Sequence, residues 1–220
     1  AAHDLALQGY EITIFEALPE PGGMLRFGIP EYRLPKDVLN REIEYIKRLG
    51  VEIKVNTKIG EEIQLEELRK AYQAIFIATG AHDSTKLNIP GEDSHGVIHA
   101  IDFLRDVNMG RKVKIGQRVA VIGGGNTAVD AARVARRLGA EVKVIYRRSR
   151  TEMPATPAEV KGAEEEGVEL IFLTNPTKII TEDGKVAKME CIQMELGEPD
   201  ASGRRRPIPI EGSEFVLEVD

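Results

Sequence analysis

The chain has 220 residues, 42% hydrophobic and 30% charged, which suits one large or two small globular domains with real cores. Its net charge of −6 provides no overall basic field for nucleic acid or an anionic membrane, and no apolar run is long enough to span a bilayer. The single cysteine, Cys191, excludes an intramolecular disulfide, a CxxC pair and a four-cysteine metal or iron–sulfur site within these residues. Without a signal-peptide pattern, we expect a cytoplasmic location.

The first part of the chain predicts alternating helices and strands. Residues 1–8 have the apolar spacing of a helix that stops at Gly9, and residues 12–16 predict a short strand that ends in Glu16. An amphipathic helix is expected over 34–50, a strand over 51–55 and a short helix over 65–72. The apolar run 74–78 predicts a further strand.

The Pro-Gly-Glu-Asp stretch at 90–93 marks the expected domain boundary, which gives domains of residues 1–92 and 93–220. A crossover helix is expected over 100–107, and strands over 119–122 and 142–146. A polar helix with solvated charges should follow residue 154, and then a β-meander in which Cys191 is an inert buried thiol. His95 and His99 favour a surface role over a metal site, and Arg204–Arg206 favour a solvated hairpin turn over a partner contact.

One unit occurs twice in the chain. The segment "AAHDLALQGYEITIFEA" at 1–17 aligns with "AARVARRLGAEVKVIYR" at 131–147, which places Gly9 over Gly139 and Glu16 over Tyr146. The second copy is preceded by a buried-type strand and a glycine loop. The same register places the corresponding strand and loop of the first copy before residue 1, so we expect the chain to be a fragment.

The complete loop predicts a dinucleotide site. It follows a strand, opens a helix and carries the spacing Gly123-x-Gly125-x-x-Ala128, with Asn126 and Thr127 in between. The glycines allow a tight turn and close approach of a pyrophosphate, and the helix N-terminus supplies amides and partial positive charge. The alternative is a purely structural turn.

The end of the next strand indicates which dinucleotide binds. A carboxylate there would hydrogen-bond a ribose 2′-hydroxyl, but the chain has Tyr146 followed by Arg147, Arg148 and Arg150. Guanidinium groups suit a 2′-phosphate, so NADP(H) is favoured over NAD(H), with a solvated basic turn as the alternative. Glu16 of the first copy suits an unphosphorylated ribose such as that of FAD.

Four stretches carry a family resemblance: "EALPEPGGMLRFGIPEYRLP" (16–35), "LGVEIKVNTKIG" (49–60), "AIFIATGAHDSTKLNIPGED" (74–93) and "VAVIGGGNTAVDAARVARRLGAEVKVIYRRSRTEMPA" (119–155). They resemble the small (beta) subunit of NADPH-dependent glutamate synthase and related flavin–NADPH modules. The resemblance implies an α/β, Rossmann-like fold of the flavoprotein type with two dinucleotide-binding domains. The FAD domain would be incomplete here, and a β-meander would lie in the NADP domain.

The resemblance also implies roles for residues of the first domain. Gly23 and Met24, with Gly22, would lie near the flavin nucleotide. Arg33 would contact the flavin side, Ile59 the adenine and Gly80 the pyrophosphate, while Glu16 would hold the FAD ribose. Each has a structural alternative: a strand-end acid for Glu16, a turn for the glycines, a surface ion pair for Arg33 and a core position for Ile59.

Two functions remain open from the sequence. In the first, the parent protein passes hydride from NADPH to FAD, and electrons leave through an iron–sulfur segment or a larger partner subunit. Such transfer needs positioning more than acid–base chemistry, so no catalytic side chain is assigned. In the second, the chain as it stands binds NADP(H) but neither binds FAD nor catalyses. A flavin disulfide reductase is disfavoured because no CxxC is present.

Overall fold

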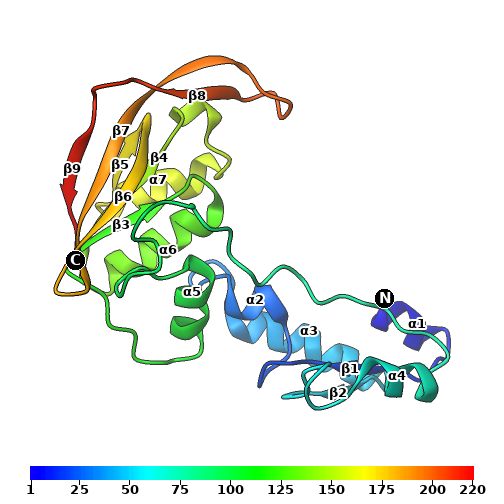
Figure 1. The fold of residues 1–220 in the computed structure, drawn as a ribbon. Helices are drawn as coiled ribbons and strands as arrows, with labels where there is room; N and C mark the ends of the chain where they lie inside the picture. The colour runs from blue at the N-terminus through cyan, green and yellow to red at the C-terminus, as the bar shows by residue number, and fades with distance from the viewer. The chain divides into compact units, whose positions relative to one another are not determined.

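The computed structural model describes residues 1–220, which form two compact units, Ala1–His82 and Asp83–Asp220 (Figure 1). None of the helices is both long and apolar enough to cross a membrane.

The first unit is built on two short parallel strands. Thr13 pairs with Glu52 and Phe15 with Lys54, so the strands after the first and third helices lie side by side. The amphipathic helix is confirmed, since it buries Leu39 and Ile43 on one stripe. The elements are α1 (Ala2–Leu7), β1 (Thr13–Phe15), α2 (Gly23–Phe27), α3 (Lys36–Arg48), β2 (Glu52–Lys54) and α4 (Leu65–Ala71).

The predicted strand at 74–78 is not formed. Residues 74–89 contain no helix or strand, and the side chains of Phe76 and Ile77 are 75% and 71% exposed. An apolar strand is stable when neighbouring strands satisfy its backbone and its side chains are covered. The sheet of this unit consists of β1 and β2 only, and neither pairs with this segment. The apolar pattern alone was therefore insufficient.

The second unit begins with a parallel α/β layer. Its three strands lie in the order β3-β4-β5, and every connection between them contains a helix. The parallel register, with Val119 opposite Val142 and Val144 opposite Leu170, confirms the expected strand–helix–strand organisation. The elements are α5 (Ala100–Asn108), β3 (Arg118–Ile122), α6 (Asn126–Arg137), β4 (Glu141–Tyr146), a 3₁₀ turn η1 (Arg150–Glu152), α7 (Pro157–Glu165) and β5 (Glu169–Phe172).

Strand β3 differs from the fully buried strand that the sequence predicts. Its residues Val119–Ile122 are only half-buried, because β3 lies at the edge of the sheet and pairs with β4 alone. Strand β4 is central and buries Val142, Val144 and Ile145. Helix α6 packs on both strands through small residues, namely Ala128, Ala131, Ala132 and Ala135.

The predicted β-meander is confirmed as a four-stranded antiparallel sheet, in which β7 pairs with β6, β8 and β9 (Figure 1). Asp183 and Gly184 have φ of 51° and 76° at the β6–β7 turn, as a tight hairpin requires. The strands are β6 (Thr174–Glu182), β7 (Lys185–Pro199), β8 (Arg205–Pro209) and β9 (Phe215–Glu218).

The two sheets of the second unit share a core. Ile145 of β4 packs with Met189 and Cys191 of β7 and with Val219. Cys191 is completely buried, as predicted, and burial raises the pKa of its thiol to about 11. A thiol with this pKa is almost entirely protonated at neutral pH, which supports an inert role.

Candidate dinucleotide-binding site

The glycine loop connects β3 to α6 in a tight turn. Gly123 has a φ of 130°, which an L-residue rarely adopts, and its amide donates to the Ile145 carbonyl at 3.0 Å. A Cβ on Gly123 would lie 3.4 Å from the Cβ of Ala128, in close contact. Gly123 and Ala128 thus allow the helix to begin close against the strand, as the spacing predicts.

The middle glycine, Gly124, has a role that the sequence did not reveal. A Cβ there would lie 2.5 Å from Cε2 of the Tyr146 ring. Tyr146 is buried, and its hydroxyl donates to the Glu152 carbonyl at 2.8 Å. The residue at the strand end thus packs under the loop instead of presenting a polar group to a ribose.

The start of α6 offers backbone amides to an anion. Gly125 precedes the helix without a side-chain cap, and a Cβ on it would meet no atom within 4 Å. The amides of Asn126, Thr127 and Ala128 have no partner within the helix, as in any first turn. Open space beside uncapped amides and the positive end of the helix dipole suits a pyrophosphate.

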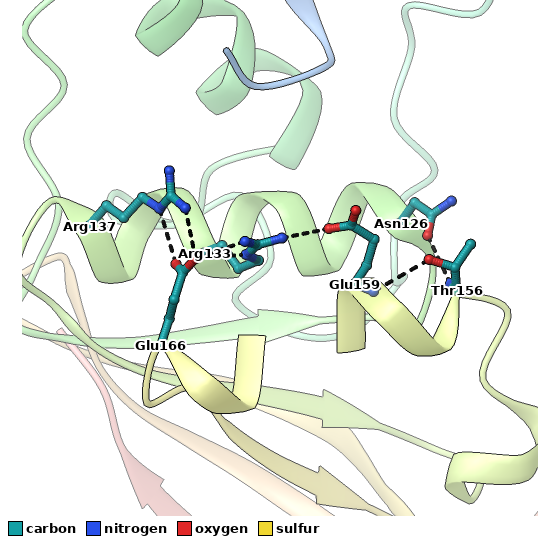
Figure 2. Close-up of polar contacts among 6 residues, drawn as sticks. All are labelled: Asn126, Arg133, Arg137, Thr156, Glu159 and Glu166. Carbon is teal, nitrogen blue, oxygen red and sulfur yellow. Dashed lines mark hydrogen bonds and ion pairs between the residues drawn. The ribbon is translucent and has the colours of Figure 1, made fainter. Parts of the chain in front are cut away.

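The Asn126 side chain is occupied in the structure. Its Oδ1 accepts a hydrogen bond from the Thr156 amide at 3.1 Å, and the Ala155 amide donates to the Gly124 carbonyl at 3.0 Å. Both contacts hold the segment before α7 against the glycine loop, and Figure 2 shows the one between Asn126 and Thr156. The Asn126 side chain therefore has a structural role, because it fastens the segment before α7 to the glycine loop.

An ion-pair cluster joins α6 to α7 (Figure 2). Arg133 lies 2.6 Å from Glu159 and 2.8 Å from Glu166, and Arg137 lies 2.7 Å from Glu166. Hydrogen bonds from Arg137 and Arg133 lower the pKa of Glu166 from 4.5 to about 2. The charges of the polar helix were predicted to be solvated, but Glu159 is half-buried and paired, as is Glu166 just beyond the helix. The signal for this contact was the spacing of Arg133 and Arg137, one helical turn apart.

The three arginines after β4 have different surroundings. Arg147 is exposed and makes no hydrogen bond or ion pair within the protein. Arg148 is only 5% exposed; its Nη2 lies 2.7 Å from Oδ2 of Asp200. Arg150 pairs with Glu164, and its guanidinium lies 5.3 Å from the centre of the Phe172 ring. Arg147 is thus the most available of the three to a phosphate.

An apolar cavity of about 750 Å³ lies beside the unpaired edge of β3 and reaches the first turn of α6. Phe103, Val119, Val121 and Thr127 are among its lining residues. Its charged lining residues balance in sign: Lys114, Arg118 and Lys185 against Asp83, Glu92 and Asp220. We therefore expect a phosphate to bind at the α6 amides and the arginines after β4 rather than in this cavity.

The first unit places Glu16 just after β1. Its Oε1 accepts a hydrogen bond from the Leu18 amide at 2.9 Å, and its carbonyl accepts from the Thr57 amide at 2.9 Å. Gly23 has a φ of 51°, and a Cβ on it would meet nothing within 4 Å. Met24 follows it in α2, a short helix that the sequence did not predict.

Three further predicted site residues, Arg33, Ile59 and Gly80, belong to separate segments of the first unit. Arg33 lies half-buried in the turn before α3, and its amide donates to Pro30 at 3.0 Å. Ile59 is 37% exposed and bridges to Ile63. Gly80 has a φ of 73° within the irregular segment.

Arg26 is a buried residue that sequence reasoning missed. It is 7% exposed, and its Nε donates to the Pro21 carbonyl at 2.6 Å while Nη1 lies 2.7 Å from Glu20. Its neighbour Gly22 has a φ of 129°, and a Cβ there would lie 2.9 Å from Leu39. Gly22 therefore lies in a packed turn, whereas the next residue, Gly23, faces open space. No sequence pattern distinguished Arg26 from a surface arginine.

Comparison with known proteins agrees with this geometry. The family profile described as "Pyridine nucleotide-disulphide oxidoreductase" matches residues 1–202. The chain belongs to this family. One curated relative is the "NADP(+)-dependent formate dehydrogenase subunit beta" of Moorella thermoacetica. It is 54% identical over the whole of this chain, which covers 32% of that protein.

A second relative is the "Glutamate synthase [NADPH] small chain" of Escherichia coli (strain K12), 39% identical over 98% of this chain and 48% of that protein. The chain thus spans about a third to a half of the length of these curated relatives. The structure "Mycobacterium tuberculosis FprA in complex with NADPH" matches with a TM-score of 0.85 at 23% identity, over 100% of this chain and 66% of that one. This likeness confirms the expected Rossmann-like α/β fold.

Proposed function

We propose that this chain is a portion of an NADPH-dependent flavin oxidoreductase and contains its NADP(H)-binding domain. The observation that carries the proposal is the turn from the glycine loop into α6. The first amides of α6 have no side-chain cap, and the space beside Gly125 is open. The neighbouring strand, β4, is followed by the exposed Arg147. Gly123, Gly125, Asn126, Thr127 and Ala128 would form the pyrophosphate side, and Arg147, Arg148 and Arg150 the 2′-phosphate side.

The first domain, proposed as residues 1–92, would belong to the FAD side of the parent protein, and residues 93–220 to the NADP(H) side. Two features support the FAD assignment: an acid, Glu16, at the end of β1, and open space at Gly23. Met24, Arg33, Ile59 and Gly80 would complete the FAD contacts in the intact protein.

In the intact protein, FAD would supply the acceptor for the hydride of NADPH, so that NADPH would be oxidised to NADP⁺ as the flavin is reduced. The residues of this chain would orient NADPH and would discriminate against NADH by charge. No proton transfer is assigned to a side chain. The names of the two relatives reported above contain the words "subunit beta" and "small chain". We therefore propose that electrons leave through an iron–sulfur segment or a partner subunit. We also propose that the parent protein is cytoplasmic.

A second candidate is an NADP(H)-binding module that neither binds FAD nor catalyses as a separate chain. The exposed apolar segment at 74–78 favours it, because this segment forms no strand beside the two strands of the first unit. The two candidates share the NADP(H) site and differ in whether flavin is retained.

The test is to purify the 220-residue chain, record its visible spectrum, incubate it with FAD and remove unbound flavin. NADPH and NADH are then added without oxygen. A retained flavin band that NADPH bleaches faster than NADH supports the oxidoreductase. A colourless chain that binds NADPH supports the module. A chain that binds neither nucleotide contradicts both.

A further inference from the structure

A second group of arginines lies in an open hollow of about 690 Å³ next to the end of β4. Part of the hollow comes from the loop after β4 and part from the β7–β8 hairpin, which lies more than fifty residues later in the sequence. The lining residues are Arg147, Arg148, Asp200, Ala201, Ser202, Arg204, Arg206 and Pro207.

The hollow is strongly positive in a chain of net charge −6. Its lining includes four arginines and one carboxylate, that of Asp200. Asp200 is neutralised by Arg148 at 2.7 Å, and hydrogen bonds from Ser202 lower the pKa of Asp200, so it stays ionised. Arg147, Arg204 and Arg206 make no ion pair, so three positive charges remain uncompensated.

The hairpin is fastened to the β4 loop by contacts to two buried residues, Arg148 and Glu152. Arg148 Nε donates to the Arg205 carbonyl at 2.8 Å, and Arg205 Nε donates to Oε1 of buried Glu152 at 2.6 Å. Arg205 thus turns toward η1, while its neighbours Arg204 and Arg206 both line the hollow, as strand alternation requires. The three guanidinium groups that make no ion pair all line the hollow between the fastened hairpin and the β4 loop. Nε of Arg204 donates to Oγ of Ser202 at 3.0 Å, a neutral partner that leaves the charge of Arg204 uncompensated.

The hollow also lies at the expected end of the dinucleotide site. Arg147 follows β4 directly, and the neighbouring carbonyl of Ile145 accepts a hydrogen bond from Gly123 of the glycine loop. In doubly wound folds the adenosine ribose lies beyond the end of this strand. A phosphate on that ribose would face the hollow, whereas an unphosphorylated ribose would leave the arginines without an anion.

We propose that Arg204 and Arg206 of the β7–β8 hairpin, together with Arg147, form a phosphomonoester subsite that reads the 2′-phosphate of NADP(H). The inference rests on the proposed function and assigns the choice between the two nicotinamide dinucleotides to the hairpin as well as to the β4 loop. Arg148 is the positioning residue, since it fastens the hairpin through Asp200 and Arg205.

The test compares the 220-residue chain with the double variant R204Q/R206Q. The matched control is R69Q/K112Q, which also removes two positive charges that make no ion pair, from exposed residues that do not line the hollow. Affinities for NADPH and NADH are measured by titration, and those for 2′,5′-ADP and 5′-AMP report the adenosine end alone. Circular dichroism melting verifies that each variant is folded.

We expect R204Q/R206Q to weaken NADPH and 2′,5′-ADP about ten- to hundredfold, since charge-assisted hydrogen bonds are lost, and to change NADH and 5′-AMP less than about twofold. The control should leave all four unchanged. If the wild-type chain prefers NADPH and the double variant keeps that preference, the subsite is refuted and the proposed function stands. Equal weakening of all four ligands also refutes the subsite. Wild-type chain that binds no dinucleotide overturns both.

Discussion

The two copies of the repeated unit, α1–β1 and α6–β4, have the same local geometry and different surroundings. Gly9 and Gly139 have φ of 87° and 103° after their helices, and their amides donate to Ala6 and Arg136, each at 3.0 Å. Yet α1 buries no residue, whereas α6 buries seven of its twelve. Helix ends are determined by local hydrogen bonds, while burial depends on the sheet that the helix covers.

The strand ends of the two copies differ in charge. Glu16 after β1 accepts a hydrogen bond from Leu18, and Arg147 after β4 lies exposed in a positive hollow. An acid favours a ribose hydroxyl, and arginines favour a ribose phosphate. We therefore propose that the two copies bind different nucleotides, mainly through the residues at and just after the ends of their strands.

The largest expected effect contrasts the two kinds of glycine. Gly124→Asn should destabilise the chain by about 3 kcal/mol and abolish NADPH binding, because its Cβ would overlap the buried Tyr146 ring. Gly9→Asn should cost less than about 1 kcal/mol, because Asn tolerates the left-handed region and the space is open. Urea unfolding measures both. Equal losses at the two positions would contradict the account of the loop.

The next effect concerns the α6–α7 cluster, which has no counterpart at α1. The pKa of Glu166 is about 2 in the folded chain, against 4.5 for an ordinary Glu, so its carboxylate stays ionised in mild acid. Its stabilisation, about 2–3 kcal/mol, is therefore present above pH 4.5 and lost as the pH falls toward 2.

The measurement is the free energy of unfolding of wild type and Glu166→Gln between pH 2 and 6. The difference between them should shrink by that amount as the pH falls. Glu165→Gln is the control, since this side chain is 65% exposed and only 3.4 Å from Lys161 in a surface pair. A difference between Glu166→Gln and wild type that stays constant from pH 2 to 6 would show that ionisation of Glu166 does not stabilise the fold.

The smallest effect should come from the strand-end arginines. Arg147→Gln should weaken NADPH about tenfold, and Arg150→Gln less, because Arg150 is already paired with Glu164. NADH binding should change in neither variant. The reverse ranking in a fluorescence titration would mean that Arg150 leaves Glu164 to bind the phosphate.

Local features were predictable from the sequence: the helix stops at Gly9 and Gly139, the α6 N-terminus and the parallel strands around it. The strand at 74–78 failed because a pattern does not reveal whether neighbours are present to pair with it. The ion-pair partners of Arg148 and Arg150 could not be predicted either. Asp200, for example, is 52 residues from Arg148 in the sequence, and only folding brings the two together. The sequence shows that Tyr146, and not a carboxylate, ends β4, but the packing of Tyr146 against Gly124 required coordinates.

The most direct test of the central claim is a titration of the 220-residue chain with NADPH and NADH under one set of salt conditions. The account predicts that NADPH binds at least about tenfold more tightly, because only its 2′-phosphate meets the free arginines. Equal affinity for the two dinucleotides, or no binding of either, would contradict the account.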